Sequence, residues 1–167
     1  ADDLKRRDFT INALAVDKDG QVIDKFDGLK DLDKKIIRAV GHAEERFHED
    51  ALRMMRAVRF QAQLNFKIEE KTAQAIADNA PLLAKIAIER IREEFVKMML
   101  SQNWQTGLAD FIKLGLSEYC PGFKDQKLEL AELLEIKDTE FVDEEAAFSA
   151  IGYVLSLNHQ EFNAFLR

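Results

Sequence analysis

The feature that most constrains the fold is a helical periodicity, which begins near residue 49 and continues almost to the end of the chain. Ala51, Met55 and Val58 recur at three- or four-residue spacing, which places them on one face of a helix. Prolines, the strongest helix breakers, number only two in 167 residues. We therefore predict helices over residues 49–64, 69–79, 88–100, 104–114, 128–134 and 144–155.

The first 41 residues carry shorter signals of mixed type. Residues 14–16 and 21–23 flank Asp17-Lys18-Asp19-Gly20, which favours a β-hairpin because glycine tolerates the positive φ of such turns. Further elements are expected at residues 8–14 (a helical turn or a strand), 29–34 (a short helix) and 36–40 (a strand that ends at Gly41). The sequence thus predicts a mainly α fold, in which a small β-hairpin piece precedes a helical array.

Charge is unevenly distributed along the chain. Residues 1–100 carry 19 basic and 19 acidic residues, whereas residues 101–167 carry 5 and 12, so the net charge of −7 comes from the last third. A polyanion would therefore be bound by the first part of the chain. No apolar run approaches the roughly 20 residues of a transmembrane helix, and Cys120 is the single cysteine, so we expect a cytoplasmic protein without an internal disulfide.

A charged segment between residues 46 and 60 contains the first candidate site. Asp50 and Arg53 are three positions apart on one predicted helix, so their side chains are expected to be neighbours. Arg56 and Arg59 continue at the same spacing round the polar side. Taken alone, this pattern is most simply a set of intrahelical ion pairs, each worth roughly a few tenths of a kcal/mol.

The same Asp50 and Arg53 pair also suits the recognition of nucleobases. A carboxylate only accepts hydrogen bonds and a guanidinium only donates them, so the two offer an acceptor beside a donor. Cytosine and adenine present an amino donor next to a ring-nitrogen acceptor, whereas uracil and guanine have a carbonyl in place of the amino group. A fixed pair would accept C and A and reject U and G by on the order of 1–3 kcal/mol per lost contact.

A second cluster consists of Arg6-Arg7-Asp8 followed by Asn12. Two adjacent guanidinium groups suit phosphate oxygens, and Asp8 or Asn12 could accept a hydrogen bond from a ribose hydroxyl. As an isolated segment these residues are better explained as a solvated charge cluster. Asp31-Leu32-Asp33 has the D-x-D spacing of two-metal sites, but its lysine-rich, helical surroundings disfavour metal binding.

Four segments in this order resemble the family of CCA-adding tRNA nucleotidyltransferases and bacterial poly(A) polymerases, over about residues 4–123. Residues 6–13 look like the ribose-recognising motif of that family, and residues 26–32 with 37–41 look like its connection between head and neck. Residues 49–60 resemble the motif whose amino acids act as the template, and residues 89–95 resemble the helix that buttresses it. The four together override the simpler interpretations of each cluster.

The resemblance implies a parent enzyme that adds C, C and A to tRNA 3′ ends from CTP and ATP with Mg²⁺, releasing pyrophosphate. Asp50 and Arg53 would read the incoming base, Arg7 and Asp8 would hold the ribose and triphosphate, and Arg56 would support the template or the phosphates. Supporting roles are implied for Arg6, Asn12, Glu49 and Arg59.

The resemblance also implies a division into three parts. Residues 1–41 would be the C-terminal part of the nucleotidyltransferase head (palm), residues 42–100 a helical neck, and residues 101–167 the start of a helical body. In the family, the Gly-rich loop and the catalytic D-x-D precede the ribose motif. We therefore interpret Ala1 as a cut point, assign no catalytic or metal-binding residue to this chain, and expect the chain alone to be inactive and to self-associate.

Two other functions fit the same residues. A poly(A) polymerase or an A-adding member of the family would share every one of these motifs. A non-catalytic helical RNA-binding module is the alternative from another class, although the acidic residues 101–167 offer no obvious surface for a polyanion.

Overall fold

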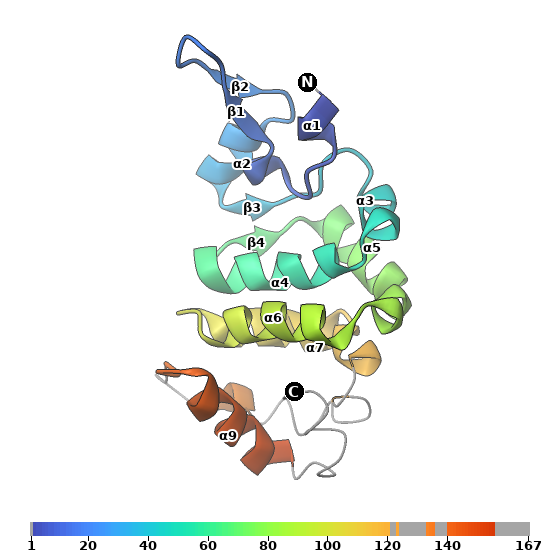
Figure 1. The fold of residues 1–167 in the computed structure, drawn as a ribbon, viewed down its shortest axis with the longest axis vertical. Coiled ribbons are helices and arrows are strands. Elements are labelled where there is room, and N and C mark those ends of the chain that lie inside the picture. The colour runs from blue at the N-terminus through green and yellow to red at the C-terminus, as the bar shows by residue number, and fades with distance from the viewer. Residues whose placement is uncertain (1, 121–122, 124–132, 136–139, 156–167) are drawn as a thin grey trace.

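Helices stacked in layers beneath a small head make up the fold (Figure 1). The structure is a computed structural model that describes residues 2–120, 123, 133–135 and 140–155. The β-hairpin lies at one end of the stack, the long helices of the neck follow, and the last described helix lies at the other end. The predicted mainly α fold with a small hairpin is confirmed.

The head contains the hairpin where the sequence predicts it. Its elements are α1 (Asp2–Lys5), the 3-10 turn η1 (Thr10–Asn12), β1 (Leu14–Val16), β2 (Val22–Asp24) and α2 (Gly28–Lys34). The strands are antiparallel, with Leu14 opposite Asp24. The Asp17 side chain accepts hydrogen bonds from the backbone N–H of Asp19 (2.9 Å) and of Gln21 (2.8 Å), which stabilises the turn.

A short parallel pair of strands joins the head to the neck. β3 (Ile36–Ile37) pairs with β4 (Lys67–Ile68), with Ile36 opposite Lys67. The predicted strand over residues 36–40 is therefore shorter than expected, although Ala39 still forms a bridge with Phe9. β4 was not predicted, because two residues are too few for a recognisable pattern.

Buried polar contacts fix α2 and β3 to each other and to the neck. The Asp31 carboxylate is buried and accepts hydrogen bonds from Thr10 Oγ1 (2.6 Å) and Arg38 Nε (3.0 Å). Arg38 also pairs with Glu69 at 3.2 Å. The hydrogen bond to Asp31 raises the pKa of Arg38 above its ordinary value. Asp31 thus has a structural role, because its carboxylate holds η1 and Arg38 together.

The neck and the following layers are helical. Their elements are α3 (Ala43–Glu49), α4 (Leu52–Leu64), α5 (Glu70–Asn79), η2 (Ala80–Lys85), α6 (Ile88–Met99), α7 (Trp104–Lys113), η3 (Leu116–Tyr119), η4 (Leu133–Glu135) and α9 (Glu144–Leu155). Four predicted helices agree to within one residue at each end. Of the helix predicted at 128–134, residues 128–132 lie outside the described residues. The predicted division of the chain into head, neck and body stays a prediction.

The predicted helix over residues 49–64 is wrong at its beginning. α3 ends at Glu49, and Asp50 adopts an extended backbone (φ −151°, ψ 104°) before α4 begins at Leu52. The Asp50 carboxylate accepts a hydrogen bond from the backbone N–H of Leu52 at 3.1 Å, which satisfies a donor that a helix start leaves free. Asp50 therefore lies at a corner between two helices and not within one.

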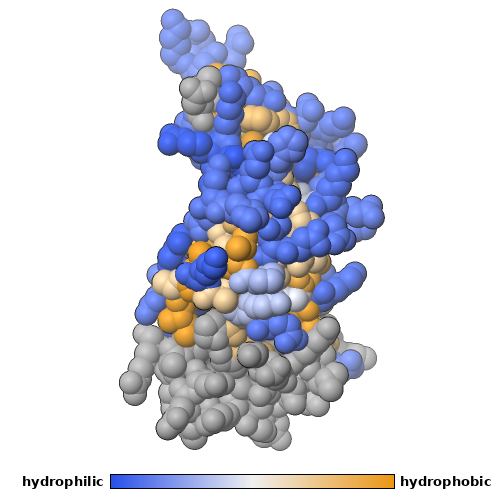
Figure 2. All heavy atoms as spheres, turned by 90° about the vertical axis from the view of Figure 1, so that its right-hand side faces the viewer, coloured by the Kyte–Doolittle hydropathy of each residue, from blue (hydrophilic) through white to orange (hydrophobic). Residues whose placement is uncertain are grey.

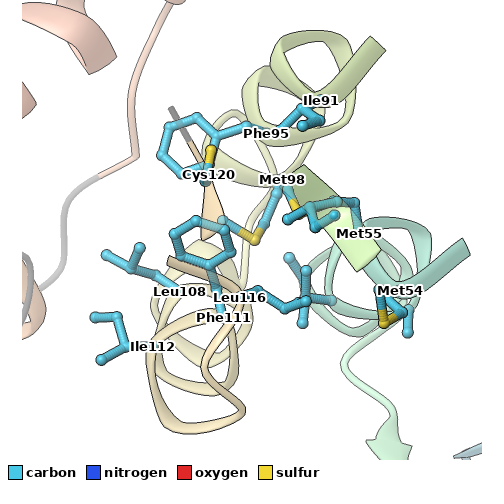
Figure 3. Packing of buried hydrophobic residues seen from close by; sticks show 14 of the residues in the cluster. Met54, Met55, Ile91, Phe95, Met98, Leu108, Phe111, Ile112, Leu116 and Cys120 are labelled. Carbon is cyan, nitrogen blue, oxygen red and sulfur yellow. The ribbon is translucent and has the colours of Figure 1, made fainter. Parts of the chain in front are cut away.

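The core lies where α4, α6 and α7 meet (Figure 3). Met55, Phe95 and Phe111 are fully buried there, and the Phe95 and Phe111 ring centroids lie 5.5 Å apart. Cys120 is buried in the same core, and this burial raises the pKa of its thiol, so the side chain acts as a small apolar group. No helix in the described part of the chain has the length and apolar character needed to cross a membrane.

Hydrophobic residues also reach the surface in places. On the face shown in Figure 2, hydrophilic residues cover most of the head and upper neck, and hydrophobic residues are visible mainly lower down. Within the head, Val16 is 66% exposed and Val22 is 53% exposed. The hairpin therefore exposes these two apolar side chains on its surface.

Gly107 determines how closely α7 approaches α4. A Cβ at this position would lie 2.8 Å from the Val58 carbonyl oxygen and 2.9 Å from Met98 Cγ. We expect Gly107→Ala to lower the free energy of unfolding by about 1–3 kcal/mol, because a rigid backbone atom would have to move. Chemical denaturation measures this. Thr106→Ala, at an exposed position of the same helix, is the control; a Gly107→Ala protein as stable as this control would contradict the packing.

Candidate functional site

A cleft of about 660 Å³ lies between the head and the neck. Five arginines and three aspartates line it, so cations outnumber anions and the cleft suits a polyanion. The lining residues are Asp3, Arg6, Arg7, Asp8, Asn12, Asp50, Leu52, Arg53, Arg56 and Arg90. All the residues that the sequence assigns to base and ribose recognition are among them, and of the supporting residues only Glu49 and Arg59 lie outside the lining.

Asp50 enters the cleft from the corner between α3 and α4. One carboxylate oxygen accepts the Leu52 backbone N–H, and the other accepts a hydrogen bond from Arg90 Nη2 at 2.9 Å. The side chain stays 33% exposed. A carboxylate has about four acceptor positions, so Asp50 is oriented by two partners and can still accept a hydrogen bond from a ligand.

Arg53 lies on the first turn of α4 and is held by groups other than Asp50. Its Nη1 donates to Glu49 Oε2 (2.7 Å) and to the Arg46 carbonyl (3.1 Å), and its Nη2 donates to the Arg6 carbonyl (2.8 Å). The expected neighbour pair is thus replaced by two pairs, Asp50 with Arg90 and Glu49 with Arg53. Since a guanidinium has five N–H groups, these contacts leave about two donors for a ligand.

Asp8 is more buried and has more hydrogen-bond partners than we expect of a residue that binds a ribose. Its carboxylate is 6% exposed and accepts hydrogen bonds from the Phe9 backbone N–H (3.0 Å) and Asn12 Nδ2 (2.6 Å). The same carboxylate forms an ion pair with Arg56 Nε. Asp8 therefore fixes the 3-10 turn of the head and orients Arg56, and it retains at most limited capacity for a further donor.

Arg56 connects Asp8 of the head to the carboxylate of Glu94 on α6, which lies 4.0 Å away. Glu94 is buried and also pairs with Arg59. Arg56 and Arg59 both stack on Phe60, with guanidinium carbons 5.1 Å and 4.4 Å from the ring centroid. The expectation that Arg59 lies on the polar side of the helix is wrong: it is 9% exposed and pairs with Glu94 of α6.

Arg6 and Arg7 are two accessible cations of the site that pair, among the described residues, only with the exposed carboxylate of Asp3. Arg6 contacts Asp3 at 3.4 Å and Arg7 contacts the same carboxylate at 3.1 Å, and the side chains are 76% and 47% exposed. Ion pairs this exposed are weak, so both arginines can leave Asp3 for a stronger anion such as a phosphate.

Sequence reasoning missed three residues of the cleft, the apolar Leu52 and the charged Asp3 and Arg90. Arg90 was placed in the helix that buttresses the template motif, but not at the site. Its partner Asp50 lies 40 positions earlier, so no local spacing could reveal the contact. The one available signal was its place in the first turn of a helix already assigned to support the site, although Glu93 and Glu94 at i+3 and i+4 offered simpler partners.

A larger hollow of about 900 Å³ lies on another side of the neck, between α3 and α5. Its charged residues are two cations and three glutamates, together with His42 and His48, and none of the predicted site residues lines it. This balance does not favour a polyanion, so we take the smaller cleft as the candidate site.

Comparison with known proteins identifies the class to which this arrangement belongs. Residues 1–38 match the family described as the poly A polymerase head domain, and residues 65–127 match the family described as the probable RNA and SrmB-binding site of polymerase A. The chain belongs to the family of CCA-adding tRNA nucleotidyltransferases and bacterial poly(A) polymerases.

Individual relatives carry one name. The chain is 53% identical over 167 residues to the CCA-adding enzyme of Limosilactobacillus reuteri, covering 100% of this chain and 41% of that protein. It is 63% identical over 131 residues to the CCA-adding enzyme of Lactobacillus johnsonii, covering 78% of this chain and 33% of that protein. The chain thus spans well under half the length of these curated relatives.

Solved structures agree with the sequence matches. The CCA-adding enzyme of Bacillus stearothermophilus, crystallised with CTP, superposes with a TM-score of 0.92 at 39% identity, covering 99% of this chain and 42% of that one. A tRNA nucleotidyltransferase complexed with a primer tRNA and an incoming ATP analogue gives a TM-score of 0.78 at 28% identity, covering 98% of this chain and 52% of that one.

The ionic contacts of Arg56 can be tested by stability. Arg56→Met leaves Asp8 and Glu94 buried without this cation, and we expect a loss of about 3 kcal/mol in the free energy of unfolding. Urea denaturation measures it. Asp8→Asn combined with Arg56→Met should cost less than the sum of the two single changes.

Arg6→Met is the matched control, since it removes an exposed arginine from the same cleft and should change stability by less than about 0.5 kcal/mol. Equal effects of Arg6→Met and Arg56→Met would show that the contacts of Arg56 with the two carboxylates add nothing.

Proposed function

We propose that a protein containing this chain adds C, C and A to tRNA 3′ ends from CTP and ATP, and that this chain supplies base and ribose recognition. The observation that carries the proposal is the cleft in which Asp50 and Arg53 of the neck face the arginines of the head. The similar proteins named as CCA-adding enzymes support it.

Base selection follows from the hydrogen-bonding groups of Asp50 and Arg53. Asp50 accepts from the amino group that cytosine and adenine share, and Arg53 donates to the neighbouring ring nitrogen. Uracil and guanine would place a carbonyl oxygen against the carboxylate. Arg90 orients Asp50 and Glu49 orients Arg53 without a nucleotide, so little rearrangement energy is spent when the base binds.

The triphosphate and ribose are assigned to the head side of the cleft. Arg6 and Arg7 are accessible cations for phosphate oxygens, and Arg56 of α4 lines the same cleft from the neck side. Asp8 is assigned to the ribose with Asn12 in support: Asn12 Nδ2 donates to Asp8 at 2.6 Å, and Asn12 Oδ1 accepts the Phe9 N–H at 3.2 Å. In this proposal residues 1–41 belong to the head, residues 42–100 form the neck, and residues 101–167 begin the body.

Magnesium belongs to the proposed reaction, since two-metal chemistry stabilises the attacking and leaving oxygens in nucleotidyl transfer. The residues that the structure describes do not fit such a centre: among them no group of three or more His, Cys, Asp or Glu side chains could hold a metal ion. We therefore assign Mg²⁺ to residues outside the described part, and we assign to this chain the binding and orientation of the nucleotide.

The direct test supplies the full-length protein with tRNA that lacks its 3′ end, together with CTP and ATP, and sequences the products. Addition of CCA followed by a stop supports the proposal. A-only tails would instead identify a poly(A) polymerase, and a single A would identify an A-adding enzyme. Salt-dependent tRNA binding without any incorporation would indicate the RNA-binding module.

The 167-residue chain alone provides a second arm of this test. Because its described residues offer no metal-binding carboxylate cluster, we expect it to incorporate no nucleotide. The exposed Val16 and Val22 of the hairpin also support self-association of the isolated chain. Sedimentation should then show species larger than a monomer, and a purely monomeric profile would contradict this.

The base-reading role of Asp50 predicts a selective defect. In the full-length protein, Asp50→Ala should lower the preference for CTP and ATP over UTP and GTP by roughly tenfold or more, with a smaller effect on tRNA affinity. Single-nucleotide incorporation and tRNA binding measure the two quantities.

Asp3→Asn removes an exposed carboxylate from the same cleft and serves as the control, with selectivity expected to stay unchanged. If Asp50→Ala kept full selectivity, the assignment of Asp50 as a base reader would be wrong.

A further inference from the structure

Arg46, Glu49 and Arg53 form a closed ring of hydrogen bonds with the backbone carbonyls of Lys5 and Arg6. Arg46 Nη1 donates to the Lys5 carbonyl (2.6 Å), and Arg46 Nη2 donates to Glu49 Oε1 (2.6 Å). The other oxygen of Glu49 accepts from Arg53, and Arg53 donates to the Arg6 carbonyl. The peptide bond between Lys5 and Arg6 closes the ring, so two arginines of the neck bind neighbouring carbonyls of the head.

Arg46 occupies the part of this ring that a ligand does not reach. It does not line the cleft, and its side chain is 12% exposed, whereas Glu49 is 46% exposed. Glu49 is therefore an exposed carboxylate that would be mobile without a second partner. With Arg46 on one oxygen and Arg53 on the other, both of its oxygens are fixed in direction.

We propose that Arg46 is a positioning residue for base selection: it holds Glu49, and Glu49 holds the guanidinium of Arg53 at the cleft. This inference rests on the proposed function. Arg46 touches neither base nor phosphate in this scheme. Arg46 acts by restricting the orientation of the Arg53 guanidinium, so that the N–H groups of Arg53 not used in the ring point into the cleft.

The ring also couples the two halves of the site. Lys5 and Arg6 directly precede Arg7 and Asp8, so the carbonyls that hold Arg46 and Arg53 belong to the segment assigned to phosphate and ribose. A change in the ring should therefore disturb base recognition and nucleotide affinity together. Loss of Arg46 is expected to raise the KM for CTP as well as to lower selectivity.

The choice of arginine follows from the geometry of the ring. One guanidinium spans a backbone carbonyl and a carboxylate through two separate nitrogens, which the single ammonium of lysine cannot do with the same directions. Arg46→Lys should keep the charge and rescue only part of the function, and Arg46→Met should lose both donors.

The test compares full-length variants by kcat/KM for CTP relative to UTP on tRNA without its 3′ end. We expect Arg46→Met to lower this ratio roughly tenfold, with Arg46→Lys in between. Because Arg46 would act through Glu49, Arg46→Met combined with Glu49→Gln should be no less selective than Arg46→Met alone.

Arg38→Met is the matched control. Arg38 also bridges head and neck, through Asp31 and Glu69, but it does not line the cleft. Arg38→Met should lower the Tm by at least as much as Arg46→Met, because Asp31 is buried whereas Glu49 is exposed, and it should leave the CTP to UTP ratio unchanged. A loss of Tm without a loss of selectivity separates positioning from general stability.

The outcomes separate the two proposals. Unchanged selectivity in Arg46→Met, or strictly additive effects with Glu49→Gln, would overturn the positioning role while leaving the proposed function intact. If the unsubstituted protein adds neither C nor A, the proposed function fails and the role of Arg46 fails with it.

Discussion

Arg56 lies between two buried carboxylates, Asp8 of the head and Glu94 of α6, and the relative placement of head and neck depends on this interaction. Removing charges from water is costly, so such a group persists only when each member has compensating partners. Here the partners include a backbone N–H, Asn12, Arg59 and the face of Phe60. The charged groups therefore fix how the head is placed on the neck, whereas burial of the apolar core between α4, α6 and α7 provides most of the free energy of folding.

The cleft takes its shape from these constraints. One wall comes from the first residues of the chain, another from the corner at Asp50, and a third from α6 through Arg90. Arg53 is held by a carboxylate and two carbonyls, and Arg90 is held by Asp50. Within the described part of the chain, Arg6 and Arg7 by contrast pair only with the exposed Asp3. In the proposed function, the oriented region would bind a planar base and the more adaptable region the phosphates.

Local patterns were sufficient to predict the hairpin and most helices, whereas most residues that line the cleft were assigned only through the resemblance of four segments to a known family. The Asp17–Gly20 turn and the apolar spacing of α4 to α7 are properties of short segments, which a single sequence displays. The break at Asp50 was missed because alanine, leucine and methionine after it continue a helical pattern. The pairing of Asp50 with Arg90 was missed because it depends on how two helices cross, which no local pattern encodes.

The parallel pair of β3 and β4 has a consequence for divergence within the family. It joins head and neck through main-chain bonds, such as those from the Lys67 N–H to the Lys35 carbonyl and from the Glu69 N–H to the Ile37 carbonyl, both 2.9 Å. Every residue except proline carries these groups, so the hydrogen bonds themselves do not depend on which side chains the two strands carry. Replacement is restricted instead by burial, because Ile37 and Ile68 lie in the hydrophobic core, and the register of the connection can persist wherever their apolar packing is kept.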